Sequence, residues 1–449
     1  MAPQSGLFVT SRRRLLLAGG AGTALAACTG GAPSRGGAPA APTLRSDVSL
    51  QLLLTIAAED QGLFEGVVTG WRNAHPQGPG VEWGTPASAD IVQKLEALLA
   101  ASTPPDLITL EPTQAVSFSA RGQLLAIDDL IKRDHYDLTD FFRPAVDQYR
   151  WKQKLYGLGR GMSNQSMFIN QTLFDQAGVP YPPTKATDPG WDFDAFLTTA
   201  TRLTKRDGSG VTQYGFIVTR GRRGGWAQWV WTNGAEVFDK DFTRCTLDDP
   251  RAVEALQLMQ DLIYKYRVAP TPKEEADAGG ANALFVSSGI VAMRISPVAD
   301  ISTHRRASFS WDYAVNPKGK GRRLTTGGGV GWSILSATRN AEEAWAVFNY
   351  LTGPEAARQM ATKWYPARKS ALDYLNAADP QLPPHSRWVG ADGQELLHPD
   401  PIFPDYNQIE QSIIAPELNA LWNNERPARA VVAAIVPKIN DYLKTHPQL

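Results

Sequence analysis

The chain is poor in cysteine, since Cys28 and Cys245 are the only two among 449 residues. Two cysteines cannot form the disulfide framework that stabilises many small secreted domains. Its six histidines lack the spacing of metal ligands, and neither a nucleophile-elbow pattern nor a phosphate-binding loop is present. The triplet Gly327-Gly328-Gly329 precedes an expected strand rather than a helix, so it is no dinucleotide cradle. We therefore expect no enzyme activity, no metal site and no cofactor.

Net charge and long apolar runs are lacking as well. The chain carries 45 basic and 45 acidic residues, so its formal net charge is zero, which does not favour nucleic-acid binding. Beyond the N-terminal segment no apolar run reaches the length of a membrane-spanning helix, which excludes a channel or a permease. The roughly 400 residues that follow are too many for one small core and predict two lobes.

The N-terminus is predicted to direct export. Residues 1–27 combine the basic run Arg12–Arg14 with a short stretch of apolar and small residues, which is typical of a signal peptide. The basic run resembles a twin-arginine motif, and Leu25-Ala26-Ala27-Cys28 resembles a bacterial lipobox. We expect cleavage before Cys28 and a lipid on that residue, leaving Cys245 without a disulfide partner. The alternative is an ordinary signal peptide with an incidental cysteine. Residues 28–45 are rich in Gly, Ala, Pro, Ser and Thr and predict a flexible tether.

Strands and helices are expected to alternate in the first third of the mature chain. The expected order is a strand at Val48–Leu54, a helix at Leu63–Trp71, a strand at Val81–Trp83, a helix at Ile91–Leu99 and a strand at Asp106–Leu110. This order predicts an α/β fold with a mostly parallel sheet flanked by helices. Ligands bind beyond the carboxyl ends of such strands, here near Thr55–Asp60 and Glu111–Thr113.

Later segments continue this alternation. Strands are expected at Tyr214–Val218, Ile290–Met293, Trp311–Val315 and Gly331–Leu335, and helices at Trp191–Leu203 and through much of Ile409–Leu443. Asn170, Asp249 and Asn340 are expected to cap helices, and Pro250 fits the first helical position after Asp249.

Six sequence blocks resemble family 1 extracellular solute-binding proteins of ABC sugar importers, the family that includes maltose-binding protein. The blocks are 93–108, 122–127, 155–170, 285–293, 327–351 and 363–368. They follow one another in the family's order, and the similarity extends from Val48 to Leu443. Gly159, Phe168 and Lys363 depart from the family's usual residues, which leaves the ligand's identity open.

The resemblance implies two α/β lobes of the type II periplasmic-binding fold, joined by a hinge that the chain crosses more than once. We place one lobe at 46–157 plus 327–372 and the other at 158–326 plus 373–449. It further implies a monomer that captures a carbohydrate between its lobes and delivers it to the membrane subunits of an ABC permease. The lipid expected on Cys28 would hold this monomer at the outer face of the cell membrane. Two alternatives stay open: a polyol, glycerol phosphate or peptide ligand, and a secreted glycan-degrading enzyme.

A sugar site needs aromatic side chains for the apolar ring faces and polar groups for the hydroxyls. The densest aromatic cluster contains Trp226 and Trp229, and we expect at least one of them to face the cleft. Glu111 follows a strand end and is expected to face the cleft too. For each of these residues the alternative is an ordinary place, in the core for a tryptophan and in a solvated loop for Glu111.

The resemblance adds candidates near the hinge and before the last helices. They are Arg160, Ser163 and Asn164 at the first crossing, Trp332, Trp364 and Arg368 at the return crossing, and Tyr406. Trp332 alternates with apolar neighbours, so a core position is its alternative. Arg368 has a surface ion pair as its alternative. A cleft that brought Arg160 and Arg368 together would favour an anionic ligand.

Overall fold

The computed structural model describes residues 43–56, 58–86, 91–208, 210–362, 364–377 and 383–447. The predicted signal peptide, the lipid site Cys28 and most of the predicted tether lie outside the described residues. Backbone contacts separate residues 44–449 as one compact unit, and this unit is described here. Within the part of the chain that the structure describes, no helix has both the length and the apolar character needed to cross a bilayer.

The first sheet has five strands in the order β2-β1-β3-β13-β6. Their bounds are Gly80–Gly84, Ser49–Leu53, Leu107–Leu110, Gly331–Ile334 and Leu158–Gly159, respectively. β1 pairs in parallel with β2 and β3, whereas β13 runs antiparallel to β3 and β6. The predicted β-α-β-α-β order in this part of the chain is thus confirmed.

The second sheet is built around β7 (Ser163–Asn170), which pairs antiparallel with β10 (Met293–Pro297), β11 (Trp311–Ala314) and β12 (Gly327–Gly328). Two small hairpins lie outside these sheets, β4 (Arg150–Trp151) with β5 (Lys154–Leu155), and β8 (Lys205–Asp207) with β9 (Gly210–Gln213).

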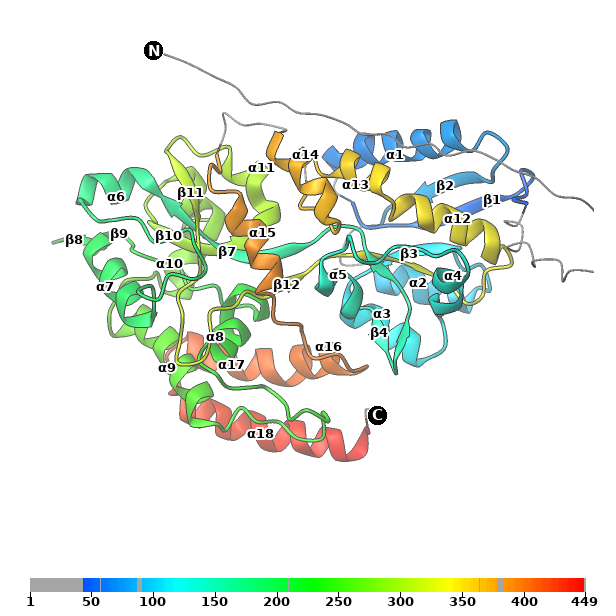
Figure 1. Ribbon diagram of the computed structural model, residues 1–449. Helices are drawn as coiled ribbons and strands as arrows, with labels where there is room; N and C mark the ends of the chain where they lie inside the picture. Colours follow the sequence, from blue (N-terminus) through cyan, green and yellow to red (C-terminus); the bar gives the residue numbers. More distant parts are fainter. Residues whose placement is uncertain are drawn as a thin grey trace, which may run out of the picture. The chain divides into compact units, whose positions relative to one another are not determined.

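Helices flank both sheets (Figure 1). Beside the first sheet are α1 (Gln61–Ala74), α2 (Ile91–Ala100), α3 (Pro112–Ala120), α4 (Asp128–Arg133), α5 (Arg143–Asp147), α12 (Ala341–Leu351) and α13 (Pro354–Met360). The others are α6 (Gln171–Ala177), α7 (Phe193–Leu203), α8 (Ala227–Thr232), α9 (Pro250–Tyr264), α10 (Pro272–Asp277), α11 (Ile301–His304), α14 (Leu372–Ala377), α15 (Trp388–Glu395), α16 (Tyr406–Ile409), α17 (Ala415–Trp422) and α18 (Ala428–Thr445).

Each sheet has its own hydrophobic core, which is the two-lobed arrangement of periplasmic binding proteins. One core holds Phe64, Trp71 and Trp332 beside the first sheet, and the other holds Phe168 and Trp229 beside the second. β6, which begins directly after the predicted first segment 46–157 of that lobe, pairs with β13 in the first sheet.

The chain passes from the first sheet to the second between β6 and β7 and returns between β12 and β13. The two passing segments approach closely, because a side chain at Gly329 would collide with the backbone carbonyl of Gly161. Gly327 adds a φ of +148°, a conformation that side-chain-bearing residues rarely adopt. Glycine is therefore required where the crossings lie side by side.

Three local expectations need correction. Tyr214–Val218 forms no named strand, because it makes only isolated parallel bridges, at Tyr214 with Val291 and at Ile217 with Arg294, and between them the Phe216 N–H donates to the Val268 carbonyl. β10 starts at Met293, so most of the expected strand Ile290–Met293 precedes it. Asn340 occupies the N-cap position of α12 without capping it, because its amide oxygen accepts from Arg45 and its amide nitrogen lies 3.4 Å from Asp106.

The other two expected caps are confirmed. The Asn170 side chain accepts from the Leu173 N–H and begins α6, and the Asp249 side chain accepts from the Arg251 N–H and begins α9. Cys245 is fully buried, and burial raises the pKa of its thiol to about 12. It forms no disulfide within the described residues.

Candidate ligand-binding site

Polar side chains gather where the carboxyl ends of β1 and β3 face residues of the second lobe. Glu111 directly follows β3, and its N–H donates to the side chain of Gln114, 2.9 Å away. Thr55 follows β1, and its N–H donates to the Thr109 hydroxyl at 2.9 Å. These contacts fix the backbone at both strand ends, and Glu111 and Gln114 form the capping box at the start of α3.

Arg223 connects carboxylates of both lobes. Its Nη1 lies 3.4 Å from the Glu111 carboxylate, and its Nε and Nη2 donate to Asp400 Oδ2 at 3.0 and 2.8 Å. The Asp400 side chain is 5% exposed, whereas that of Glu111 is 43% exposed. Burial alone would lower the pKa of Arg223, but Asp400 and Glu111 outweigh it and raise this pKa above its ordinary value.

Arg222 extends the same network. It contacts Asp400 Oδ2 at 3.2 Å and the Asn407 side-chain oxygen at 3.3 Å, and its guanidinium lies 5.0 Å from the centre of the Tyr406 ring. Asn407 in turn donates to the Thr113 hydroxyl of the first lobe at 2.9 Å. The lobes are thus joined by an ionic contact at Arg223 and a hydrogen bond at Asn407.

Arg160 lies on the neighbouring hinge segment. Its Nη2 donates to the Thr55 carbonyl at 2.7 Å, and its guanidinium lies 4.9 Å from the centre of the half-buried Trp364 ring. Tyr149 interacts electrostatically with Glu111, Arg223 and Arg160, which places these charges in one neighbourhood. We call Glu111, Tyr149, Arg160, Arg222, Arg223, Trp364, Asp400 and Tyr406 the inter-lobe cluster.

Several buried polar atoms in and beside this cluster have no hydrogen-bond partner. They are Gln148 Nε2, Arg160 Nη1, Ser163 Oγ, Arg222 Nε, Asp400 Oδ1 and Tyr406 Oη. Native structures rarely leave buried donors and acceptors unpaired, since each costs about 1–3 kcal/mol. A concentration of such atoms between two lobes is the arrangement that a polar ligand with many hydroxyl groups would complete.

The structure places four of the candidate residues in or beside the inter-lobe cluster and a fifth at its edge. Glu111, Arg160, Trp364 and Tyr406 belong to it, and Ser163 begins β7 opposite Gly328. A side chain at Gly328 would meet Gln148 and Arg223. These five positions, far apart in sequence, are therefore brought together by the fold.

The other candidate tryptophans lie in the hydrophobic cores. Trp229 is 2% exposed and stacks on Phe193 with ring centres 4.9 Å apart. Trp332 is fully buried and stacks on Phe64 at 5.8 Å. Trp226, 1% exposed, belongs to the core beside the second sheet. These are the positions named above as alternatives to the cleft.

Arg368 and Asn164 lie in separate buried networks. Arg368 donates to the Thr352 carbonyl at 2.7 Å, to Asp140 at 3.1 Å and to the Tyr136 hydroxyl at 2.8 Å. Asn164 donates to Ser166 and accepts from Gln394. Arg368 and Arg160 are thus held by different partners, and the structure does not pair them.

Sequence reasoning missed Arg222, Arg223 and Asp400. The two arginines stand between Gly221 and Gly224, in a segment whose backbone leaves helical geometry at Arg223. A basic pair flanked by glycines just before the tryptophan cluster was a usable signal. Asp400 carried none, because its partners lie 177 and 178 positions away along the chain.

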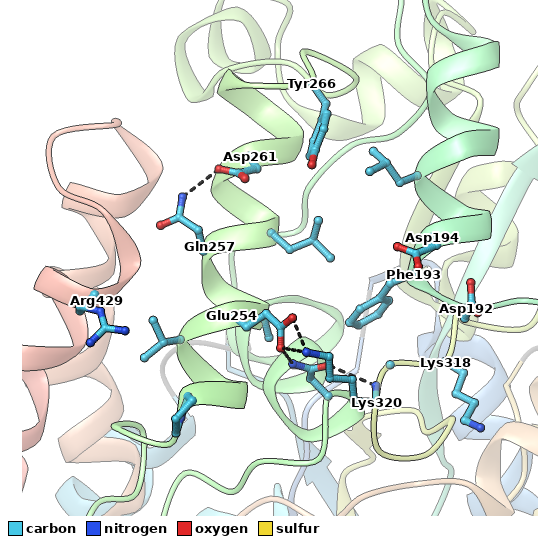
Figure 2. A pocket seen from close by; sticks show the side chains of 17 residues that line it. Asp192, Phe193, Asp194, Glu254, Gln257, Asp261, Tyr266, Lys318, Lys320 and Arg429 are labelled. Atoms are coloured by element: carbon cyan, nitrogen blue, oxygen red, sulfur yellow. Dashed lines mark hydrogen bonds and ion pairs between the residues drawn. The ribbon is translucent and has the colours of Figure 1, made fainter.

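A cavity of about 740 Å³ lies elsewhere, between α7 and α9 of the second lobe (Figure 2). Phe193 and Tyr266 point into it, and its Glu254 forms an ion pair with Lys320 at 2.5 Å. None of its lining residues belongs to the inter-lobe cluster. The unpaired buried polar atoms of the inter-lobe cluster favour the cluster over this cavity as the ligand site.

Within the described ranges, no three His, Cys, Asp or Glu side chains come together in a way that would hold a metal ion. The carboxylates of the cluster instead contact guanidinium groups.

Solved structures with the same fold include an ABC substrate-binding protein from Listeria monocytogenes in complex with cycloalternan. It shares 21% identity and a TM-score of 0.77, over 88% of this chain and 99% of that one. A cyclic α-maltosyl-1,6-maltose binding protein from Arthrobacter globiformis shares 17% identity and a TM-score of 0.74, over 89% of this chain and 99% of that one.

Curated relatives match over shorter segments. A putative binding protein of Brucella abortus is 25% identical over 58% of this chain and 61% of its own length. An arabinooligosaccharide-binding protein of Halalkalibacterium halodurans is 25% identical over 48% of this chain and 46% of its own length. The model of the bacterial extracellular solute-binding proteins matches residues 59–358. The chain therefore belongs to the family of bacterial extracellular solute-binding proteins.

Proposed function

We propose that this protein captures a carbohydrate between its lobes and delivers it to the membrane subunits of an ABC permease. The observation that carries the proposal is the set of buried, unpartnered polar atoms in and beside the inter-lobe cluster. Relatives described as binding cycloalternan and arabinooligosaccharides support the same ligand class. The protein acts as a monomer in this proposal.

The chemistry of the cluster suits a sugar. Carboxylates and guanidinium groups bind hydroxyls as acceptors and donors, and the Trp364 ring offers an apolar surface to a sugar face. We assign ligand contacts to Glu111, Arg160, Ser163, Trp364 and Tyr406, together with Arg222, Arg223 and Asp400. Asn164, Trp226, Trp229, Trp332 and Arg368 are left out because other contacts hold them.

A saccharide that binds is expected to raise the melting temperature. At a concentration of 100 times its Kd, a ligand that binds only the folded state adds about 2.7 kcal/mol to the free energy of unfolding. Differential scanning fluorimetry with mono- and oligosaccharides, followed by calorimetry, makes the measurement. Trp364→Ala should weaken binding at least about tenfold by removing an aromatic contact worth more than about 1.4 kcal/mol. Trp388→Ala, at a tryptophan that is 50% exposed, is the matched control and should bind normally. Absence of stabilisation by every saccharide contradicts the proposal.

A glycan-degrading enzyme is the competing function. Such an enzyme needs two carboxyl groups about 5–9.5 Å apart, one of them protonated to act as an acid. In the cluster, the carboxylates of Glu111 and Asp400 both form ion pairs with the guanidinium of Arg223. Glycan turnover that disappears in Glu111→Gln would establish the enzyme instead.

We also propose that lipid on Cys28 holds the protein at the outer face of the membrane. Its support is the lipobox-like sequence at the end of an apolar run. Cys28→Ser should release the protein into the medium or the periplasm and leave saccharide affinity unchanged. Cell fractionation, with Cys245→Ser as the matched cysteine control, makes the comparison. A Cys28→Ser variant that stays with the membrane contradicts the lipid anchor.

A polyol, glycerol phosphate or peptide ligand remains the second candidate in the same cleft. The same fluorimetry panel separates these ligands from saccharides, because only a bound compound shifts the melting temperature.

A further inference from the structure

The guanidinium group of Arg160 is buried with few partners. The residue is 9% exposed. Its Nη2 donates to the Thr55 carbonyl at 2.7 Å, and Trp364 covers the group at 4.9 Å. Its Nη1 is buried without a hydrogen bond. Among the residues that the structure describes, no carboxylate forms an ion pair with it.

The other two arginines of the inter-lobe cluster differ from Arg160. Arg222 and Arg223 share Asp400 Oδ2, and Arg223 also reaches Glu111. Of the three guanidinium groups, Arg160 is therefore the one that makes no direct ion pair, although the buried carboxylate of Asp60 lies close enough to attract it. Asp60 attracts Arg160 electrostatically, but burial has the larger effect and lowers the pKa of Arg160 to about 10.

A buried guanidinium that makes no direct ion pair and leaves one donor without a hydrogen bond is costly, with an effective penalty of several kcal/mol. At neutral pH a group with a pKa of about 10 is still protonated, so the charge persists. A sugar hydroxyl would supply a hydrogen bond to Nη1 but no negative charge. A carboxylate supplies both, and its two oxygens match the planar fork of a guanidinium.

We infer that the cleft takes an acidic saccharide, whose carboxylate pairs with Arg160 while its ring lies in the inter-lobe cluster. This inference rests on the proposed function and narrows it from carbohydrates in general to uronic-acid-containing ones. A carboxylate carries one negative charge, which matches the single guanidinium that makes no direct ion pair. A phosphate ester carries about 1.5–2 negative charges and would leave a surplus in the cleft.

Arg368 does not contribute to this recognition. Its donors are taken by Thr352, Asp140 and Tyr136, and its Asp140 contact already supplies a counter-charge. The anionic preference therefore comes from one buried arginine rather than from a pair of them.

The test compares matched sugars by titration calorimetry. The panel holds galactose, galacturonate and galactose 6-phosphate, the glucose and mannose equivalents, and short neutral and uronate oligosaccharides. We expect the preferred uronate to bind about 30-fold or more tightly than its neutral counterpart, as for a buried charge pair that loses one partner. Arg160→Met should abolish this preference. Arg160→Lys keeps the positive charge but lacks the planar guanidinium group, so it should retain part of the preference. Arg429→Met, at an exposed arginine beside the cavity between α7 and α9, is the matched control and should keep the full preference.

The outcomes separate the inference from the proposed function. Neutral and acidic saccharides that bind equally well, both weakened by Arg160→Met, overturn the acidic ligand and keep the carbohydrate function. If the phosphate esters bind more tightly than the uronates, the inference that the ligand carries a carboxylate is wrong. No binding by any saccharide overturns both. If Arg160→Met does not fold, the ratio of uronate to neutral affinity in the wild type and in Arg160→Lys still decides, since a ratio near one in both contradicts the inference.

Discussion

Replacing Trp332 or Trp229 by alanine is expected to lower the free energy of unfolding by about 3–5 kcal/mol in the absence of ligand. Trp332 is fully buried and Trp229 is 2% exposed. Each stacks on a phenylalanine of its own core, so truncation removes apolar contacts and leaves a void. Urea denaturation followed by circular dichroism makes the measurement for each lobe's variant.

The two kinds of tryptophan provide the control for this prediction. Trp388 is 50% exposed, so Trp388→Ala should change stability by no more than about 0.5 kcal/mol. Trp364 is half-buried beside Arg160, so Trp364→Ala should affect saccharide binding more than stability. A Trp332→Ala variant that keeps its stability but no longer binds saccharide would show that Trp332 contacts the ligand in the cleft and does not stabilise the core.

This contrast shows where sequence reasoning reaches its limit. Aromatic density around Trp226 and Trp229 indicates large apolar surfaces, and a hydrophobic core needs such surfaces as much as a sugar site does. Only the packing partners separate the two uses. Glu111 was easier to predict, because a residue directly after a buried parallel strand lies at the ligand-binding edge of a sheet.

The fold was more predictable than the site because it depends on local patterns. Apolar periodicity located β1, β3 and α7, and side chains at Asn170 and Asp249 started helices through contacts within three residues. The expected strand Tyr214–Val218 shows the opposite case. Its residues are buried as their apolar character predicts, but their backbone partners come from two distant segments, at Val268 and at 290–293, that periodicity does not reveal.

The ion pairs of Asp400 with Arg222 and Arg223 could not be predicted from the sequence either, for the same reason. Asp400 meets Arg222 and Arg223 only because the fold brings residues 222–223 next to residue 400. Short-range patterns carry no information on such a contact. Its energetic importance therefore has to be measured directly.

Asp400→Asn is expected to cost about 3–5 kcal/mol of unfolding free energy, the effect of removing one partner from a buried ion pair. Asparagine keeps the shape of the side chain but leaves Arg222 and Arg223 without the carboxylate that holds both of them. Urea denaturation makes the measurement, and Glu111→Gln is the control.

Glu111 lies 3.4 Å from the same Arg223, but its carboxylate is 43% exposed to solvent, so its loss should cost no more than about 1 kcal/mol. Equal effects of Asp400→Asn and Glu111→Gln would contradict the argument, since burial is what distinguishes the two carboxylates. A double-mutant cycle with Arg223→Met then measures the coupling between Asp400 and Arg223, with Arg222 present in every variant of the cycle. If Asp400 acts mainly as the counter-charge of the two arginines, Arg222→Met and Arg223→Met should each recover part of the stability that Asp400→Asn loses.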